Sequence, residues 1–439
     1  MRQPLQTKLF EKKAFVVEIY LICLASALVG GLMFSRVTKL LHLPAVTAYL
    51  VAGLLLGPFC LGALKIPGLG FSSLEQVESL SIITQTALGF IAFTIGNEFR
   101  LSQLKAMGSA AISIGILQAV ITTVVVDIVL IGLHFMFPAV ISLPCAVVLG
   151  AIASATAPAA TLMVVRQYKA NGPLTKLLML VVAIDDAVGL LLFSVSFGIA
   201  TALSQGEVSI QTIIFEPILE IVLSLILGGV MGFLLNWVEQ FFHSRSKRMT
   251  VSVAFVLLTV GLSMLDFHIG SIHCCFSLLL VCMMTGTVFC NICDTSEELM
   301  ARIDGWTMPI SILFFVISGA ELDLEILAHP ITILVGVIYI LARSAGKYYG
   351  AMSSCALTKQ SKSITNNLGI TLLPQAGVAL GMALTAASLP NGSLVRNVVL
   401  FAVLIYELVG PALTKRSLLA VGEIKLEGRT SARKLNEKS

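Results

Sequence analysis

The chain has 439 residues, of which 57% are hydrophobic and only 12% are charged, and its formal net charge is +4 at pH 7. Soluble domains carry about 25% charged residues, so this balance excludes a soluble globular protein. It predicts instead an all-α polytopic membrane protein, in which helices satisfy their own backbone hydrogen bonds within the bilayer.

Hydropathy predicts about thirteen membrane spans of roughly 17–30 residues each. The spans lie at residues 14–35, 43–62, 79–99, 108–136, 140–165, 173–204, 212–237, 249–265, 269–290, 306–327, 330–355, 364–388 and 394–414. We expect the first span to be retained. A cleaved signal peptide is the alternative, because lysines precede an apolar run that contains Ala25-Ser26-Ala27, a sequence typical of a cleavage site.

Lysine and arginine are concentrated in alternate loops between these spans, which places those loops and the C-terminus in the cytoplasm. The basic residues concerned are Arg36, Lys39, Arg100, Lys105, Arg166, Lys169, Lys176, Arg245, Lys247, Arg248, Arg302, Lys359 and Lys362. The opposite loops contain only Lys65 and Arg396. With an odd number of spans the N-terminus lies outside, although its own lysines oppose that orientation.

Two carboxylates, Asp185 and Asp186, lie side by side in the span at 173–204, with apolar residues on both sides. A charge in the middle of a bilayer costs at least ~2.5–3.5 kcal/mol, and two like charges in contact cost more unless a proton, a cation or a basic side chain intervenes. Neighbouring side chains on a helix point about 100° apart, so one aspartate can face a protein partner and the other a cavity. The pair predicts an ion or proton site; a polar pair at a helix end is the alternative.

Two spans, one in each half of the chain, are interrupted by proline among small or polar residues. The interruptions lie at residues 153–161 and 372–378, and each interrupted span neighbours a span with ionisable residues. Spans 2–6 and spans 9–13 start on opposite sides of the membrane. This is the pattern of an inverted repeat, which in transporters places the binding site near the middle of the bilayer.

Proline removes one N–H group and displaces the carbonyl four residues earlier in a helix, so Pro158 would release the carbonyl of Ser154 and Pro374 that of Ile370. Hard cations prefer oxygen ligands of this kind. Hydroxyl oxygens are added by Ser154, Thr156 and Thr161. We assign the helix breaks to Pro158, Pro374 and Gly377; simple proline kinks are the alternative.

Arg343 and Lys347 lie four residues apart, on one face of the span at 330–355. Both are deep enough to need partners, and snorkelling to the membrane surface is the alternative. The acidic residues within spans are Asp127, Asp185, Asp186 and Glu407. Four acids against two bases leave an excess of two negative charges, which protons or a cation must balance. This excess favours cation handling over anion handling.

Four stretches resemble signatures of the monovalent cation–proton antiporter superfamily. They are LPAVTAYLVAGLLLGP at 43–58, FIAFTIGNEFR at 90–100, FFVISGAELD at 314–323 and ARSAGK at 342–347. The paired aspartates are similar to those of the electrogenic sodium–proton antiporters, the second, paired-aspartate branch. The sequence departs from many relatives in reading Ala-Thr-Ala-Pro at the first break, and we expect no C-terminal regulatory domain.

The resemblance implies a secondary active transporter that exchanges a monovalent cation, with Na⁺ preferred, for protons by alternating access. The alternatives are a K⁺/H⁺ antiporter, with Li⁺ another possible cation, and a sodium-coupled organic-solute symporter of the same fold. The resemblance implies that Asp186 binds the cation and that Asp185 pairs with Lys347. The complete expected set is Asp185, Asp186, Ser154 and Thr156 for cation and proton binding, and Lys347, Asp185, Arg343 and Glu407 for salt bridges and proton coupling.

The resemblance also implies a homodimer in a bacterial inner membrane, with two broken helices that cross near the aspartates. The expected division is a scaffold at 1–107, a core at 108–204, a connecting span at 205–248, a second scaffold part at 249–327, a second core part at 328–418 and a short cytoplasmic tail at 419–439. We expect no cofactor, no nucleic-acid partner and no enzymatic activity.

Other classes fit the sequence less well. An intramembrane aspartyl protease needs two aspartates that face each other from separate helices, whereas adjacent aspartates on one helix diverge. A primary pump needs a phosphate-binding loop, and the chain lacks GxxxxGK[ST]. A channel needs no titrating carboxylate pair. Cys290 and Cys293 have CxxC spacing, but the chain has no second pair of this kind. We therefore expect them to be ordinary packing residues rather than metal ligands.

Overall fold

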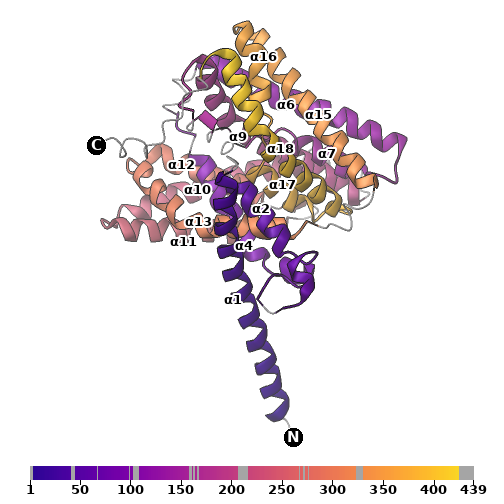
Figure 1. Ribbon diagram of the computed structural model, residues 1–439. Coiled ribbons are helices and arrows are strands. Elements are labelled where there is room, and N and C mark those ends of the chain that lie inside the picture. Colours follow the sequence, from indigo (N-terminus) through magenta and orange to yellow (C-terminus); the bar gives the residue numbers. More distant parts are fainter. Residues whose placement is uncertain are drawn as a thin grey trace, which may run out of the picture. The chain divides into compact units, whose positions relative to one another are not determined.

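The computed structural model of the chain describes residues 3–40, 45–66, 68–97, 99–101, 108–157, 161, 164–165, 168–205, 216–265, 267–269, 272–274, 276–322 and 330–424. The chain forms two compact units. Unit 1 contains Met1–Leu88 and Ile303–Ala328, and unit 2 contains Gly89–Arg302 and His329–Ser439. Figure 1 labels the longer helices of both units.

Unit 1 is a group of helices around one apolar core. Its elements are α1 (Gln3–Leu40), α2 (Ala45–Leu56), the short 3-10 helix η1 (Leu61–Leu64), α3 (Leu74–Glu78), the beginning of α4 (Ser81–Asn97) and the end of α13 (Ser296–Ala320). Helices α2 and α13 touch through their backbones, because a Cβ atom on Gly53 would lie 2.0 Å from the carbonyl oxygen of Val316. The core includes Ala27, Ala48, Tyr49, Ile312 and Ile317.

Unit 2 holds the remaining elements. They are the end of α4, α6 (Gly108–Met136), α7 (Leu143–Ile152), α9 (Pro173–Gln205), α10 (Glu216–Glu239), α11 (Arg245–Ser263), β1 (Phe267–Ile269), β2 (Ile272–Cys274), α12 (Leu278–Ile292), the beginning of α13, α15 (Pro330–Leu357), α16 (Lys362–Thr371), α17 (Gly377–Ala386) and α18 (Gly392–Val421). Both proline-interrupted spans and the paired aspartates therefore belong to this unit.

In the described part of the chain the fold is helical, as the composition predicts, apart from one short antiparallel hairpin. Strands β1 and β2 pair with Phe267 opposite Cys274 and Ile269 opposite Ile272. They occupy the beginning of the expected span at 269–290, so the helix there starts only at Leu278. The sequence explains this difference, since Gly-Ser between two short runs that alternate with histidine is a typical hairpin pattern.

The described helices support a membrane protein with many spans. Nine of them are long and apolar enough to cross a membrane, and α7, α12 and α17 are shorter apolar helices. Helix α7 and the pair α16 and α17 are short because the chain leaves the helical conformation at the two breaks. The total of about thirteen spans stays a prediction.

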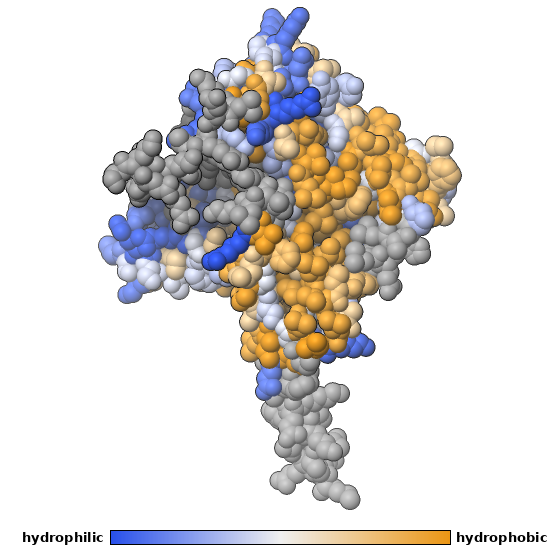
Figure 2. Space-filling model, viewed as in Figure 1, coloured by the Kyte–Doolittle hydropathy of each residue, from blue (hydrophilic) through white to orange (hydrophobic). Residues whose placement is uncertain are grey.

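Several described helices expose apolar side chains, as helices in contact with lipid do. On α10 they recur at helical spacing along one face, as Ile218, Val222, Ile226, Val230, Phe233 and Trp237. Figure 2 shows hydrophobic side chains gathered in broad areas of the visible face. Soluble monomers rarely expose contiguous apolar areas of this kind. The protein is therefore an integral multi-pass membrane protein.

Glycines bring α15 against α6, and the two helices lie side by side in Figure 1. A Cβ atom on Gly346 would lie 3.0 Å from the Cα atom of Thr122, and one on Gly350 would lie 3.0 Å from the carbonyl oxygen of Gln118. Larger side chains at these two positions would force the helices apart. Lys347, which is next to Gly346, is thereby held within reach of Gln118.

The chain that follows α18 caps the first turn of α9, the helix that carries the paired aspartates. The chain turns at Gly422, whose φ is +80°. The two oxygens of Glu423 then accept hydrogen bonds from the backbone N–H groups of Leu174 at 2.7 Å and Thr175 at 2.8 Å, and from the Thr175 hydroxyl at 2.6 Å. A carboxylate at this place satisfies free N–H groups and interacts favourably with the helix dipole. Ile424 is buried in the apolar cluster beside Leu174.

Candidate functional site

Buried ionisable side chains converge at one place within unit 2. Asp185 on α9 and Arg343 and Lys347 on α15 each have 0% of their surface exposed, and Asp186 has 2%. Burial of this kind requires that each charge be compensated by a partner or an ion. The contacts of these side chains, described next, supply most of that compensation.

Lys347 is the centre of a buried hydrogen-bonded network. Its Nζ atom lies 2.7 Å from Oδ2 of Asp185, 2.9 Å from Oγ1 of Thr156 and 3.2 Å from Oε1 of Gln118. The carbonyl oxygen of Ser154 is a further acceptor. The expected contact between Lys347 and Asp185 is therefore present in the structure, whereas its role in proton coupling stays a prediction.

Asp185 is held from both of its carboxylate oxygens. Oδ1 accepts a hydrogen bond from the side-chain amide of Gln118, and Oδ2 accepts from the Thr156 hydroxyl as well as from Lys347. Each partner comes from a different part of unit 2: α6, the chain after α7, and α15. A buried ion pair is tolerated when hydrogen bonds satisfy both charges in this way.

Gln118 is a site residue that the sequence analysis missed. It is fully buried on α6 and contacts both members of the ion pair, donating to Asp185 and accepting from Lys347. An amide can do both, because it carries donors on nitrogen and an acceptor on oxygen. The available signal was weak: a single uncharged polar residue in the apolar run Gly115-Ile-Leu-Gln-Ala-Val-Ile121.

The two broken helices begin and end alike. Helices α7 and α16 each have 10 residues, and each starts after a serine whose hydroxyl accepts from the backbone three residues on, Ser142 from Cys145 and Ser361 from Ile364. This shared pattern agrees with the expected inverted repeat. Both helices end at a non-helical stretch, after Ile152 and Thr371, and α17 resumes at Gly377.

The two breaks bind each other. The N–H group of Ala157 donates to the carbonyl of Pro374 at 2.8 Å, and the side-chain amide of Gln375 donates to the carbonyl of Ile152 at 3.0 Å. Thr161 adds a bond from its hydroxyl to the carbonyl of Thr371 at 3.3 Å. The expected break at Pro158 lies outside the described residues, and Pro374 lies within the second break as expected.

Arg343 satisfies carbonyl groups from both breaks. Its guanidinium donates to Ala153 at 3.0 Å, to Ala155 at 2.7 Å and to Leu373 at 2.7 Å. The C-terminal ends of helices carry partial negative charge, so a cation at the ends of α7 and α16 is favourable. The face of the Tyr406 ring lies 4.5 Å from the guanidinium carbon and completes its surroundings.

The expected cation ligands are placed as follows. The carbonyl of Ser154 accepts from Lys347, and its hydroxyl donates to the carbonyl of Ala151 at 2.7 Å. Thr156 contacts Asp185 and lies 3.2 Å from the Leu372 carbonyl oxygen. In this arrangement, basic side chains bind the oxygens of the breaks that we expected to face a cation. The ligand roles of Ser154 and Thr156 stay predictions.

Asp186 and Glu407 each follow, in the sequence, a residue of the buried site: Asp186 follows Asp185, and Glu407 follows Tyr406, whose ring contacts Arg343. Asp186 follows Asp185 on α9, so its side chain leaves the helix about 100° away from that of the paired aspartate. Glu407 is buried on α18, next to Tyr406, whose hydroxyl contacts Ser344 at 2.9 Å and the carbonyl of Ile340 at 2.7 Å. The cation role of Asp186 and the coupling role of Glu407 stay predictions.

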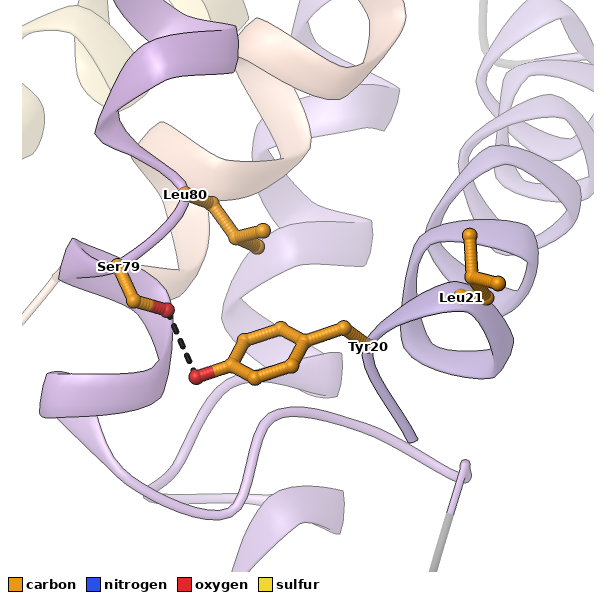
Figure 3. A pocket seen from close by; sticks show the side chains of 4 residues that line it. All are labelled: Tyr20, Leu21, Ser79 and Leu80. Carbon is orange, nitrogen blue, oxygen red and sulfur yellow. Dashed lines mark hydrogen bonds between the residues drawn. The ribbon is translucent and has the colours of Figure 1, made fainter. Parts of the chain in front are cut away.

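A surface hollow in unit 1 takes no part in this network. It has a volume of about 350 Å³ and is lined by Tyr20, Leu21, Ser79 and Leu80 (Figure 3). The Ser79 hydroxyl donates to the Tyr20 hydroxyl at 2.8 Å across it. The hollow is open and largely apolar, which does not suit an ion site.

The ion pair can be tested by a double-mutant cycle. Lys347→Gln and Asp185→Asn each remove one partner of a buried pair, and each change should lower the free energy of unfolding by about 3–5 kcal/mol. The double variant should lose much less than the sum of the two, because it leaves neither charge without its partner. Thermal unfolding of the three purified variants measures this coupling. Strictly additive losses would show that the two side chains do not interact.

A family model and two curated proteins match the sequence of this chain. The family model described as "Sodium/hydrogen exchanger, transmembrane" matches residues 24–419. K(+) efflux antiporter 5 of Arabidopsis thaliana is 33% identical over 100 residues, and K(+) efflux antiporter 6 of the same plant is 34% identical over 98 residues. These stretches are 23% and 22% of this chain but only 15% and 14% of the two relatives. The chain thus matches a small part of their length.

Solved structures share the fold. The sodium proton antiporter MjNhaP1 from Methanocaldococcus jannaschii at pH 8 matches with a TM-score of 0.71 and 19% identity, over 92% of this chain and 99% of that chain. A structure of the same antiporter from an electron-microscopy map matches with a TM-score of 0.61 and 17% identity, over 93% and 97% of the two chains. At these identities the likeness shows the helical fold.

Proposed function

This chain belongs to the transmembrane sodium/hydrogen exchanger family, and from that membership we propose that it exchanges a monovalent cation for protons across a membrane. The observation that carries the proposal is the buried network of Asp185, Lys347, Gln118 and Thr156, with Asp186 beside it on the same helix. A carboxylate buried next to a compensated ion pair is a group for which a cation and a proton can compete.

The mechanism follows from the competition for negative charge. When no cation is bound, the ammonium of Lys347 compensates Asp185. A cation that reaches Asp186 brings a second positive charge to the same place, so the buried ammonium gains less from its partner. Release of a proton from Lys347 then removes one buried charge, which couples cation entry to proton exit. Each cycle would move net charge across the membrane, as in the paired-aspartate branch to which we assign the chain.

We propose Na⁺ as the transported cation, with K⁺ as the second candidate. Sodium is supported by the description of the family and by the fold of MjNhaP1. The sequence likeness to the two K(+) efflux antiporters, over less than a quarter of this chain, is the support for potassium. Oxygen ligands alone do not rank the two ions, since both prefer them. A sodium-coupled solute symporter of the same fold is the further alternative.

We also propose an oligomeric state, an orientation in the membrane and a division of the chain into a moving core and a scaffold. The protein acts as a homodimer in a bacterial inner membrane with its C-terminus in the cytoplasm. Residues 108–204 and 328–418 form the moving core, residues 1–107 and 249–327 form the scaffold, and residues 205–248 connect them. The close packing of α6 against α15 supports the grouping of the two core parts.

Proteoliposomes with an enclosed pH-sensitive dye test the proposed exchange. An outward proton gradient should collapse on addition of Na⁺ and persist on addition of choline, a bulky organic cation. Parallel additions of Li⁺ and K⁺ rank the ions. Cation uptake without proton movement would indicate a channel, and proton movement that depends on an organic solute would indicate a symporter; either result would overturn the proposal.

A further inference from the structure

Asp127 is a half-buried acidic residue of unit 2 that the proposed exchange does not use. It lies on α6, within the apolar stretch Ser109–Met136, which is long enough to cross a membrane. At 1.5 Å per residue, it is roughly 14 Å from the end of the helix at Met136. A carboxylate is costly at such a depth in a bilayer, so its presence there calls for an explanation.

The carboxyl group of Asp127 rests directly on the backbone of α7. A Cβ atom on Gly150 would lie 1.8 Å from Oδ1 and 2.6 Å from Cγ of Asp127, which no side chain at that position allows. Gly150 is therefore required for Asp127 to take this place. It lies in the last turn of α7, and the break that contacts Asp185 and Lys347 begins three residues later, at Ala153.

No protein group compensates Asp127 in the described part of the chain. Its Oδ1 atom is shielded from solvent and makes no hydrogen bond, and the same holds for the hydroxyl of Thr123, one helical turn earlier. Two unsatisfied oxygens at adjacent turns of one helix face are unusual, because buried polar groups are normally bonded. The oxygens of Asp127 and Thr123 could accept hydrogen bonds from a water molecule, and such a water could bring a proton to the carboxylate.

The titratable groups on the neighbouring helices do not pair with Asp127 in the described part of the chain. Helices α7, α9 and α15 pack against α6. Their charged residues are Lys176, Asp185, Asp186, Arg343 and Lys347, and their other titratable residues are Cys145, Tyr339, Tyr348, Tyr349 and Cys355. Arg343 binds the carbonyls of the breaks and Lys347 binds Asp185. None of these side chains forms a hydrogen bond or ion pair with Asp127 among the described residues.

An isolated carboxylate in the membrane interior costs several kcal/mol, and a bound proton removes that cost. We propose that Asp127 is a second proton-binding site, which takes up a proton from the side of the membrane where α6 ends and α7 begins and delivers it toward the break of α7. Its ligand is the proton, carried to it by water. The delivery step rests on the proposed cation/proton exchange; the binding of the proton to Asp127 does not.

Asp127→Asn tests the binding step without any transport measurement. The amide keeps the size of the side chain but cannot exchange a proton. Infrared difference spectra of the purified protein, recorded while the pH is changed, should contain a carboxylic-acid band that titrates in the wild type and is missing from Asp127→Asn. Gly150→Ala, which pushes the carboxyl group away from α7, should shift that band. Asp294→Asn makes the same chemical change at an exposed position after α12 and serves as the matched control that retains the band.

The delivery step is tested by exchange in proteoliposomes as a function of pH. Protons are scarce at alkaline pH, so loss of a proton-collecting group should slow exchange there by about tenfold and leave the rate at acid pH nearly unchanged. A purely structural role would lower the rate equally at every pH. Thermal unfolding of Asp127→Asn should be unchanged, since no partner is lost. Asp127→Ser, smaller and also neutral, replaces it if the amide does not fit against Gly150.

The outcomes separate this inference from the proposed function. If the wild type exchanges ions and Asp127→Asn has both the same infrared titration and the same pH profile, Asp127 binds no proton and the inference is wrong. If Asp127→Asn lacks the infrared band but exchanges ions with the wild-type pH profile, Asp127 binds a proton and the delivery step is wrong. If the wild type exchanges nothing, the proposed function fails while the infrared titration still decides whether Asp127 binds a proton.

Discussion

Replacing Asp186 with asparagine should abolish cation-driven proton movement and leave the protein folded. The change removes the charge that receives the cation in the proposed mechanism, while it preserves the shape of a side chain that is only 2% exposed. A neutral amide is also easier to bury in a membrane than a carboxylate, so stability should be unchanged or higher. Dye-loaded proteoliposomes measure the exchange, and size-exclusion chromatography measures the folded state.

Asp294→Asn is the matched control, because it makes the same chemical change at an exposed position after α12. It should exchange ions at the wild-type rate. Wild-type exchange by Asp186→Asn would remove Asp186 from the site. Loss of exchange in both variants would indicate damage during purification or reconstitution rather than an effect of the missing Asp186 carboxylate.

Replacing Arg343 with methionine should have the largest effect on stability of any single change in unit 2. The guanidinium is fully buried and donates to the carbonyls of Ala153, Ala155 and Leu373, which have no helical partner because both helices are broken there. A buried acceptor that loses its donor costs about 1–3 kcal/mol, and three of them are affected at once. We expect that Arg343→Met accumulates poorly in membranes and unfolds at a much lower temperature.

Arg343→Lys separates charge from geometry. Lysine keeps the positive charge near the helix ends, but its ammonium is a point charge without the planar fork that reaches three carbonyls. Its unfolding temperature should therefore lie between those of the wild type and Arg343→Met. Arg302→Met is the control, since Arg302 is partly exposed and its contact with Glu298, at 3.4 Å, belongs to a class of ion pairs that contribute little. A wild-type unfolding temperature for Arg343→Met would disprove this role of Arg343.

The sequence predicted the elements that depend on local composition. The helical membrane fold and the family are confirmed, because hydropathy and short signatures are properties of single stretches. The break around Pro374 is also present, since proline and glycine interrupt a helix wherever it packs. The hairpin at β1 and β2 was missed because apolar character outweighed the turn signal of Gly270 and Ser271 in the hydropathy profile.

The contacts of the site depend on long-range packing and were harder to predict. The sequence analysis matched the two bases to acidic partners by counting charges. In the structure, Lys347 does contact Asp185, but Arg343 binds backbone carbonyls, which carry no formal charge and leave no trace in a charge count. Gln118 escaped notice for the same reason. Its position beside Lys347 depends on Gly346 and Gly350, whose effect appears only when α15 meets α6.

The cap that Glu423 places on α9 sets a practical boundary for shortened versions of the protein. Helix α18 ends at Val421, yet the side chains that hold the start of α9 come after it, as Glu423 and Ile424. A chain cut at the end of α18 would expose the first amide groups of the helix that carries the paired aspartates. An affinity tag or fluorescent fusion joined after residue 424 leaves the hydrogen bonds between Glu423 and the first turn of α9 in place.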